Sequence, residues 1–277
     1  MNKFKKLLVI LLPLLLIVPL MAGCQHKKAI KMNPSSWENI QKHKKVVIGI
    51  DDSFVPMGFR QKNGQLTGYD IDLAKAVFKQ YGIKPDFQTI DWSMNMTELR
   101  NQTVDVIWNG LTITDQRKKA IDFSQPYLVN QQVIVAKKSS NIKNVSDLKG
   151  KVIGAQSGSS GAQDIDKYPK ILKTKIRNQS PILYDSFNNA FIDLNANRIQ
   201  GLLIDSVYAN YYVNHMPNAK DYIVFPSGMP NEHYAVGIKK GNTKLQQKIN
   251  LALDKLEKNG ELDRINKKWF GNSQNRF

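Results

Sequence analysis

The sequence predicts an α/β protein built from two lobes with a cleft between them. With 277 residues, of which 42% are hydrophobic and 23% charged, the chain has the balance of a globular protein of one or two domains. Short apolar runs alternate with stretches of helical spacing over residues 46–108 and again over 151–213. Extended segments follow each region, so the chain is expected to cross twice between the lobes.

The first region is expected to contain three strands and two helices. In the segment 69–81, Ile71, Ala74, Val77 and Phe78 share one helical face, and acidic residues occupy its first turn. The order β-α-β-α-β predicts a parallel sheet. The expected strands are 46–50, 86–90 and 104–108, and the expected helices are 69–81 and 94–101.

The second region repeats the alternation, and the chain then returns to the first lobe. The expected strands are 131–135, 151–155, 199–204, 222–225 and 234–238, and the expected helices are 158–167, 185–196, 205–213, 245–258 and 262–268. A cleft between two such lobes, at the carboxyl ends of strands, is a favoured place for a ligand.

The N-terminus has the layout of a secretory signal peptide. Three lysines precede an uncharged run at 7–21, which is followed by Ala22 and Gly23. Fifteen apolar residues are short for a membrane-spanning helix, which needs about 20, and two prolines would disturb such a helix. We therefore expect residues 1–23 to be removed on export.

Composition disfavours several other classes of protein. The formal net charge of +17 alone would suggest nucleic acid or an anionic surface as partner, but export and the lack of an aromatic-basic recognition motif disfavour nucleic acid. A single cysteine excludes intrachain disulfides and thiolate clusters. No two of the four histidines are two to five residues apart, so the spacing of a local zinc site is missing, and we expect no metal and no cofactor.

Six short motifs occur in order over nearly the whole chain after the signal peptide. They are Ile50-Asp51-Asp52-Ser53-Phe54-Val55-Pro56, Gly64 to Ala74, Gly110 to Arg117, Ile121 to Tyr127, Leu148-Lys149-Gly150-Lys151 and Lys267-Lys268-Trp269-Phe270-Gly271. In these motifs the sequence resembles the extracellular solute-binding proteins, family 3, of polar amino acid ABC importers. The resemblance implies a periplasmic-binding-protein-like fold, in which two α/β lobes are joined by a two-strand hinge.

The segment Ala22-Gly23-Cys24 resembles the lipobox of bacterial lipoproteins, in which the cysteine is lipidated and becomes the first residue. The alternative is an unpaired thiol in a secreted protein. The expected organisation is therefore a signal peptide (1–23), a lipid-anchored basic tether (24–44), lobe one (45–130 and 231–277) and lobe two (131–230).

An α-amino acid needs a cationic partner for its carboxylate and an anionic partner for its ammonium group. Arg117 follows the turn Gly110-Leu111-Thr112, whose N–H groups are expected to assist a bidentate guanidinium. The alternative is a surface arginine beside two lysines. Asp205 ends the strand 199–204, where the family places its amine-binding aspartate; the alternative is a helix N-cap.

Other site residues are expected around this pair. Ser159 and Ser160 open a predicted helix after a Ser/Gly turn, where N–H groups can hold an anion. The remaining candidates come from the resemblance: Phe54 and Trp92 would sandwich the aliphatic part of the ligand, Asn109 would narrow the pocket or add an amide contact, Asp51 would bind a donor-bearing ligand side chain, and Gln156 would vary with specificity. As ligand, Arg, Lys, His, Gln, cystine and a small peptide thiol remain open.

The resulting hypothesis is an extracytoplasmic, lipid-anchored, monomeric protein that captures a polar amino acid by hinge closure and delivers it to the permease subunits of an ABC importer. We predict no catalytic residues and no enzyme activity, because the sequence has neither a Ser-His-Asp order nor a metal spacing. The alternatives are a dehydratase-like enzyme of amino acid precursors, and an adhesin or ligand sensor on the same fold.

Overall fold

The structure is a computed structural model that describes residues 35–271. The predicted signal peptide and Cys24 lie outside the described residues. Within residues 35–271, none of the helices is both long enough and apolar enough to cross a membrane.

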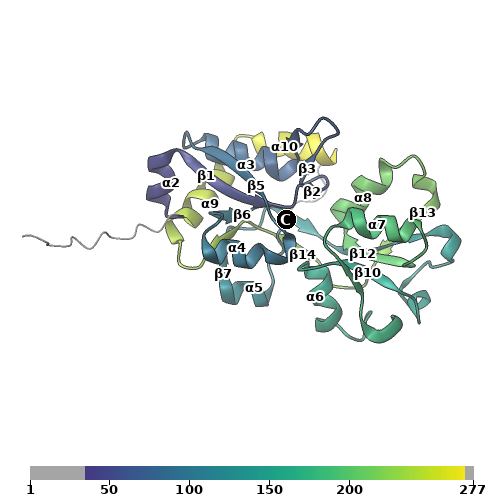
Figure 1. The fold of residues 1–277 in the computed structure, drawn as a ribbon. Coiled ribbons are helices and arrows are strands. Elements are labelled where there is room, and N and C mark those ends of the chain that lie inside the picture. Colours follow the sequence, from purple (N-terminus) through teal and green to yellow (C-terminus); the bar gives the residue numbers. More distant parts are fainter. Residues whose placement is uncertain (1–34, 272–277) are drawn as a thin grey trace, which may run out of the picture. The chain divides into compact units, whose positions relative to one another are not determined.

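The first lobe is built on a five-stranded sheet with the order β5-β1-β6-β15-β7 (Figure 1). β1 pairs in parallel with β5 and β6, whereas β15, which arrives late in the chain, is antiparallel to β6 and β7. This sheet confirms the expected β-α-β-α-β unit and the return of the chain to the first lobe. The strands are β1 (Lys45–Ile50), β5 (Lys84–Thr89), β6 (Val106–Ile107), β7 (Ile121–Phe123) and β15 (Gly237–Lys239).

Helices cover this sheet with their apolar faces. α3 buries the face predicted from its spacing and carries Asp70 and Asp72 in its first turn, where the helix dipole favours negative charge. α3 packs against both C-terminal helices. The helices of the first lobe are α2 (Trp37–His43), α3 (Tyr69–Lys79), α4 (Asn95–Asn101), α5 (Asp115–Ala120), α9 (Thr243–Lys258) and α10 (Glu261–Phe270).

The second lobe has its own five-stranded sheet, with the order β11-β10-β12-β9-β13. β10 is parallel to β11 and β12, and β9 is antiparallel to β12 and β13. The serines Ser159 and Ser186 cap α6 and α7 by accepting a hydrogen bond from a backbone N–H in the first turn. The elements are β9 (Gln132–Lys137), β10 (Ile153–Gln156), β11 (Ile182–Tyr184), β12 (Gly201–Asp205), β13 (Tyr222–Pro226), α6 (Ser160–Lys167), α7 (Phe187–Asn195) and α8 (Ser206–Asn214).

Two short strands pair where the chain passes between the two sheets. β8 (Leu128–Asn130) directly precedes β9, and β14 (Glu232–Tyr234) precedes β15. They run antiparallel, with Asn130 opposite Glu232. We call this pair the hinge strands. A small three-stranded sheet of β2 (Ser53–Phe54), β3 (Gly58–Arg60) and β4 (Leu66–Thr67) completes the first lobe.

Two expectations differ from the structure. The segment 234–238 was expected to be one strand, but β14 and β15 belong to different sheets, because Ala235 and Val236 carry the chain from the hinge into the first lobe. The segment 37–43, inside the expected tether, forms α2 and buries Trp37 and Ile40 in the core. The lysine-rich composition of this segment obscured a short amphipathic helix.

Candidate functional site

A pocket of about 230 Å³, including the part open to solvent, lies between the two lobes. Its residues come from the ends of β2, β10 and β12, the turn after β6, the start of the short 3-10 helix Trp92–Met94, and the first turns of α5 and α6. All of them are residues singled out from the sequence: Phe54, Trp92, Gly110, Thr112, Arg117, Gln156, Ser159, Ser160 and Asp205. Residues from seven segments are therefore brought together as expected at the carboxyl ends of strands.

The guanidinium of Arg117 reaches across the pocket and is held by backbone carbonyls of both lobes. Nη1 donates to the carbonyl oxygen of Thr112 and Nη2 to that of Gly158, each at 2.9 Å. The residue is only 3% exposed, and this burial lowers the pKa of Arg117 to about 10, so the side chain stays charged at neutral pH. Among the described residues, no ion pair involves Arg117. Its charge therefore suits an external carboxylate.

Asp205 forms the opposite electrostatic end of the pocket. Its Oδ1 accepts hydrogen bonds from Asn130 Nδ2 at 2.5 Å, from Gln132 Nε2 at 2.9 Å and from the Tyr234 hydroxyl at 2.8 Å. Burial, and then the charge of Glu232, raise the pKa of Asp205. The side chain does not cap α8, which removes the structural alternative considered for this residue. The described hydrogen bonds leave Oδ2 for another donor.

The turn at 110–112 is arranged differently from the expectation. The N–H of Gly110 donates to Asp70 Oδ2 at 2.7 Å, so this amide is already used within the first lobe. Gly110 has a φ of +61°, and a Cβ there would lie 2.9 Å from the Phe54 ring, so the position requires glycine. Burial raises the pKa of Asp70 to about 7. Asp70 therefore holds the turn in place through a hydrogen bond within the first lobe. It is a positioning residue that the sequence analysis missed.

Two serines of the second lobe lie beside this turn. Ser160 Oγ donates to Thr112 Oγ1 at 3.1 Å and so joins the lobes. Ser159 is instead committed to local structure, because its hydroxyl donates to the Gln156 carbonyl at 2.7 Å and accepts from Ala162 N–H at 3.1 Å. Ser159 lines the pocket mainly as the cap of α6.

The aromatic side chains Phe54 and Trp92 line the first-lobe wall. They are 5% and 7% exposed, so both are nearly buried although they face the pocket. The ring of Phe54 also packs against Phe187 and Tyr208 of the second lobe, with centroid distances of 5.9 and 5.5 Å. An aromatic wall of this kind can cover the aliphatic part of a ligand.

Asp51 and Asn109 lie beside the pocket and are not among the residues that line it. Asp51 Oδ2 accepts from Gln156 Nε2 at 2.8 Å, a third hydrogen bond between the lobes, and its Oδ1 accepts from Ser53. Asn109 Oδ1 accepts from the backbone N–H of Asp51 at 3.0 Å. Asn109 is 1% exposed and its Nδ2 lies next to Gly58. It therefore fastens the segment that carries Asp51.

Comparison with known proteins identifies the family of this chain. The model of the "Bacterial extracellular solute-binding proteins, family 3" matches residues 46–272. This chain belongs to that family. A solved relative is an ABC uptake transporter substrate-binding protein from Streptococcus pneumoniae with bound histidine. It is 47% identical, covers 87% of this chain and 98% of its own, and superimposes with a TM-score of 0.84.

Two further relatives of this solute-binding protein differ in what they are named for: one is an arginine-binding protein, and the other is the precursor of an enzyme. The arginine-binding extracellular protein ArtP of Bacillus subtilis is 30% identical over 82% of this chain and 86% of its own length. The structure of the ancestral amino-acid-binding protein AncCDT-1, a precursor of cyclohexadienyl dehydratase, is 31% identical, covers 84% of this chain and 98% of its own, and has a TM-score of 0.74. Binding proteins thus predominate among the relatives, on a fold that has also given rise to an enzyme.

Four polar residues of this solute-binding protein escaped the sequence analysis although they surround Asp205. They are Asn130, Gln132, Glu232 and Tyr234. The sequence signal was two polar residues, Asn130 directly before the run 131–135 and Gln132 within it, where an extended crossing was expected. Their partner Glu232 is about 100 residues away, so no local pattern connects them.

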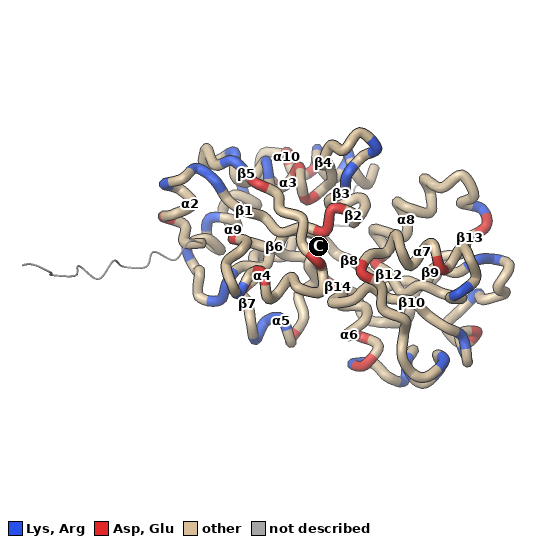
Figure 2. The backbone as a smooth tube through the Cα atoms, viewed as in Figure 1, with Lys and Arg blue, Asp and Glu red and all other residues tan. Residues whose placement is uncertain are grey.

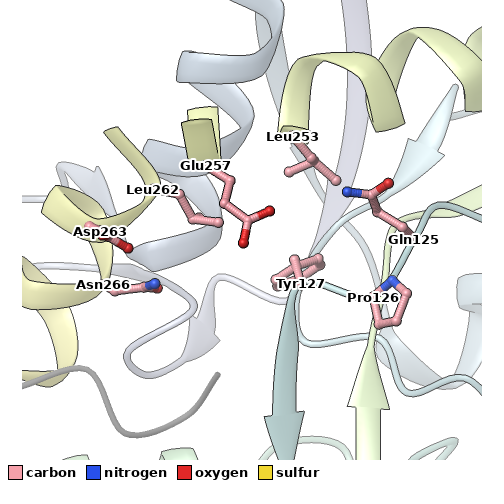
Figure 3. Close-up of a pocket in the computed structure, with 8 residues that line it drawn as sticks. All are labelled: Gln125, Pro126, Tyr127, Leu253, Glu257, Leu262, Asp263 and Asn266. Atoms are coloured by element: carbon pink, nitrogen blue, oxygen red, sulfur yellow. The ribbon is translucent and has the colours of Figure 1, made fainter. Parts of the chain in front are cut away.

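A larger hollow lies between α9, α10 and the segment 125–127 of the first lobe (Figure 3). Its volume is about 550 Å³ including its open mouth, and the Glu257 carboxylate points into it. Among the described residues, its lining includes Glu257 and Asp263 but no lysine or arginine. A ligand carboxylate would meet only like charges there, so the smaller pocket with Arg117 is the candidate site.

Proposed function

We propose that the protein is the extracytoplasmic substrate-binding subunit of an ABC importer and that it binds a polar amino acid in the pocket between the lobes. One observation carries the proposal: a buried guanidinium and a buried carboxylate, Arg117 and Asp205, line the same small pocket. Two opposite charges in one small pocket suit a zwitterion, whose ammonium and carboxylate groups are attached to the same carbon atom. The histidine and arginine named for two relatives fit this ligand class.

In the proposed complex, the ligand carboxylate binds Arg117, whose fork-shaped donor geometry matches two carboxylate oxygens. The α-ammonium group donates to Asp205 Oδ2, the oxygen that the described hydrogen bonds leave open. Phe54 and Trp92 cover the aliphatic part of the ligand. Asp51 and Gln156, at the edge of the pocket, meet the end of the ligand side chain.

Hinge closure is the proposed signal to the permease. Three hydrogen bonds join the lobes around the pocket: Arg117 with Gly158, Ser160 with Thr112, and Gln156 with Asp51. A ligand that touches both lobes adds its binding free energy to these contacts and so favours the closed form. The permease of the importer then recognises the closed form, and the receptor acts as a monomer.

Anchoring to the membrane is a separate part of the proposal. A lipid on Cys24 would hold the protein at the outer leaflet, and the lysines between Cys24 and α2 would favour an anionic surface. In the native host, Cys24→Ser is expected to move the protein from the membrane fraction to the medium or the periplasm. Continued membrane association of this variant would contradict the anchor.

A thermal-shift panel tests the ligand class. The chain from residue 25 would be heated with each of the twenty amino acids, ornithine, cystine and glutathione. A ligand at about 100 times its Kd adds about 2.7 kcal/mol to the free energy of unfolding, which corresponds to about 5 to 10 °C for a protein of this size. We expect a shift of this order with one or a few polar amino acids.

Matched controls test the two anchors of the ligand. For a response to arginine, agmatine lacks the carboxylate and N-acetyl-L-arginine lacks the ammonium group, so each should give little or no shift. An equal shift with either control would contradict the pairing of Arg117 and Asp205 with the zwitterion. The absence of any shift, or disappearance of an amino acid precursor during incubation, would favour the alternative of an enzyme.

A further inference from the structure

Asp205 and Glu232 are bridged by two side-chain amides. Nδ2 of Asn130 donates to Asp205 Oδ1 at 2.5 Å and to Glu232 Oε2 at 2.8 Å. Nε2 of Gln132 donates to the same two oxygens, at 2.9 Å each. Each amide nitrogen thus serves two carboxylates at once. Oxygens that share two donors in this way must lie close together, so the two acids form a pair.

The pair is buried at the hinge, between the ligand pocket and the strands that would bend. Asn130 and Glu232 face each other on the hinge strands, and Asp205 ends β12. Glu232 is 7% exposed, and its Oε2 also accepts from Thr112 Oγ1, a pocket residue, at 3.3 Å. Its Oε1 is buried and has no hydrogen-bond partner. A buried oxygen without a hydrogen-bond donor costs free energy, so the surroundings of Glu232 do not fully satisfy this side chain.

The charges around the pair do not neutralise both acids. Arg117 on α5 is the cation that faces them, and it interacts with both Glu232 and Asp205. Asp164 on α6 adds further negative charge near Glu232. The hydroxyl of Tyr234 on β14 donates to Asp205, and Tyr127 interacts electrostatically with Tyr234. Figure 2 shows acidic residues where β8, β12 and β14 meet, whereas lysines and arginines lie over the outer parts of both lobes.

We propose that Glu232 is a positioning residue for ligand capture: its proximity keeps a proton on Asp205 in the empty pocket, and Asp205 gives up this proton when an ammonium group binds there. The proposal rests on the proposed function. In this step the carboxyl O–H bond breaks, its electron pair stays on the carboxylate, and the proton passes to the bulk buffer. The ammonium group supplies the positive charge that the proton had provided.

The direction of the resulting pH dependence follows from linkage. Below the pKa of Asp205, binding must release its proton, so affinity rises with pH by up to about tenfold per unit for one proton. Above this pKa Asp205 is already ionised, and affinity becomes independent of pH. Burial and the charge of Glu232 both raise the pKa of Asp205, which places the change in the mildly acidic to neutral range.

Calorimetric titration of the chain from residue 25 with L-arginine tests the proposal. The arginine side chain does not titrate in this range, and L-glutamine replaces it if the panel shows glutamine binding instead. Titrations at about pH 6 in phosphate and in a buffer with a large ionisation enthalpy report the number of protons released. We expect between about half a proton and one proton, together with the rise in affinity between about pH 5.5 and 7.5.

Glu232→Gln is the decisive variant. Its amide oxygen can take the place of Oε2 and keep the donors Asn130, Gln132 and Thr112, while its amide nitrogen takes the place of the unpartnered Oε1. A melting curve checks that it folds. Removing the charge lets Asp205 ionise at lower pH, so the variant should bind without releasing a proton and with an affinity that varies little from pH 5.5 to 7.5.

Asp164→Asn is the matched control, because Asp164 interacts electrostatically with the same Arg117 and Glu232 but shares no described hydrogen bond with the amides. We expect it to release the proton as the unmodified chain does. Unchanged proton release in Glu232→Gln, or its loss in Asp164→Asn, would overturn the proposal. Binding without proton release in the unmodified chain would overturn this inference alone, whereas no amino acid binding would overturn the proposed function.

Discussion

The two charged ends of the pocket are built in different ways. Arg117 is held by backbone carbonyls, one from each lobe, at Thr112 and Gly158. Asp205 is held by side chains on or next to the hinge strands. The geometry at Arg117 therefore depends on contact between the lobes, whereas the geometry at Asp205 is preformed by the hinge. A ligand would therefore find the site for its ammonium group already formed. The site for its carboxylate would be completed only when the lobes close.

The largest effect is expected at the Arg117 end. Arg117→Ala leaves the ligand carboxylate in a buried pocket without its partner, which should cost about 2 to 5 kcal/mol of binding free energy. Isothermal calorimetry with L-arginine or the best ligand of the panel measures it. Lys119→Ala, an exposed neighbour on α5, is the control and should bind normally. An affinity in Arg117→Ala that equals the control would contradict the carboxylate assignment.

The next largest effect is expected at the Asp205 end. Asp205→Asn keeps an oxygen for the three donors of the hinge but loses the charge that faces the ammonium group. A hydrogen bond to a charged group contributes about 1.5 to 3 kcal/mol, so affinity should fall by about ten- to hundredfold. Asp166→Asn, an exposed residue of α6, is the control. A variant that binds as tightly as this control would place the ammonium group elsewhere.

The same contrast explains how much of the site could be predicted from the sequence. Arg117 could be predicted because it stands in one of the short motifs, and Asp205 because it follows a predicted strand; amino acid chemistry requires both charges. The alternating apolar runs likewise predicted both sheets. These features depend on residues that are neighbours in the chain.

What escaped prediction depends on residues far apart in the chain. The amide-bridged pair of Asp205 and Glu232 joins β8, β9, β12 and β14, and no spacing within one segment reveals it. The use of the Gly110 N–H by Asp70 spans 40 residues. α2 was missed because its two buried residues, Trp37 and Ile40, gain their stability from tertiary packing and give little local signal.

A substitution at Gly158 can weaken the contact between the lobes while Arg117 and Asp205 stay unchanged. A Cβ at this position would lie 2.7 Å from the Ser93 Cα and 3.0 Å from the Trp92 carbonyl oxygen, both of them backbone atoms of the other lobe. Gly158→Ala should therefore oppose closure, and its φ of +72° adds strain to the loop itself. We expect a loss of about 1 to 2 kcal/mol of binding free energy.

Small-angle scattering distinguishes this effect from unfolding, because the variant should remain folded but become less compact with ligand than the unmodified chain. Gly64→Ala is the control: this glycine also has a positive φ, but a Cβ there would meet no atom within 4 Å. If both variants lost the same affinity, backbone strain alone would account for the result and Gly158 would have no part in closure.

The smallest effect is expected at the edge of the pocket, where Asp51 meets the ligand side chain in the proposed complex. Asp51 is only half-buried and already accepts hydrogen bonds from Gln156 and Ser53, so a further donor adds to an occupied carboxylate that water partly screens. Asp51→Asn should weaken arginine binding by about 0.5 to 1.5 kcal/mol and leave glutamine binding almost unchanged. Calorimetry with both amino acids measures the difference. Both ligands present the same carboxylate and ammonium group to Arg117 and Asp205. An equal loss of affinity for both would therefore mean that Asp51 acts only through its contact with Gln156, and that it joins the lobes without contacting the side chain of the ligand.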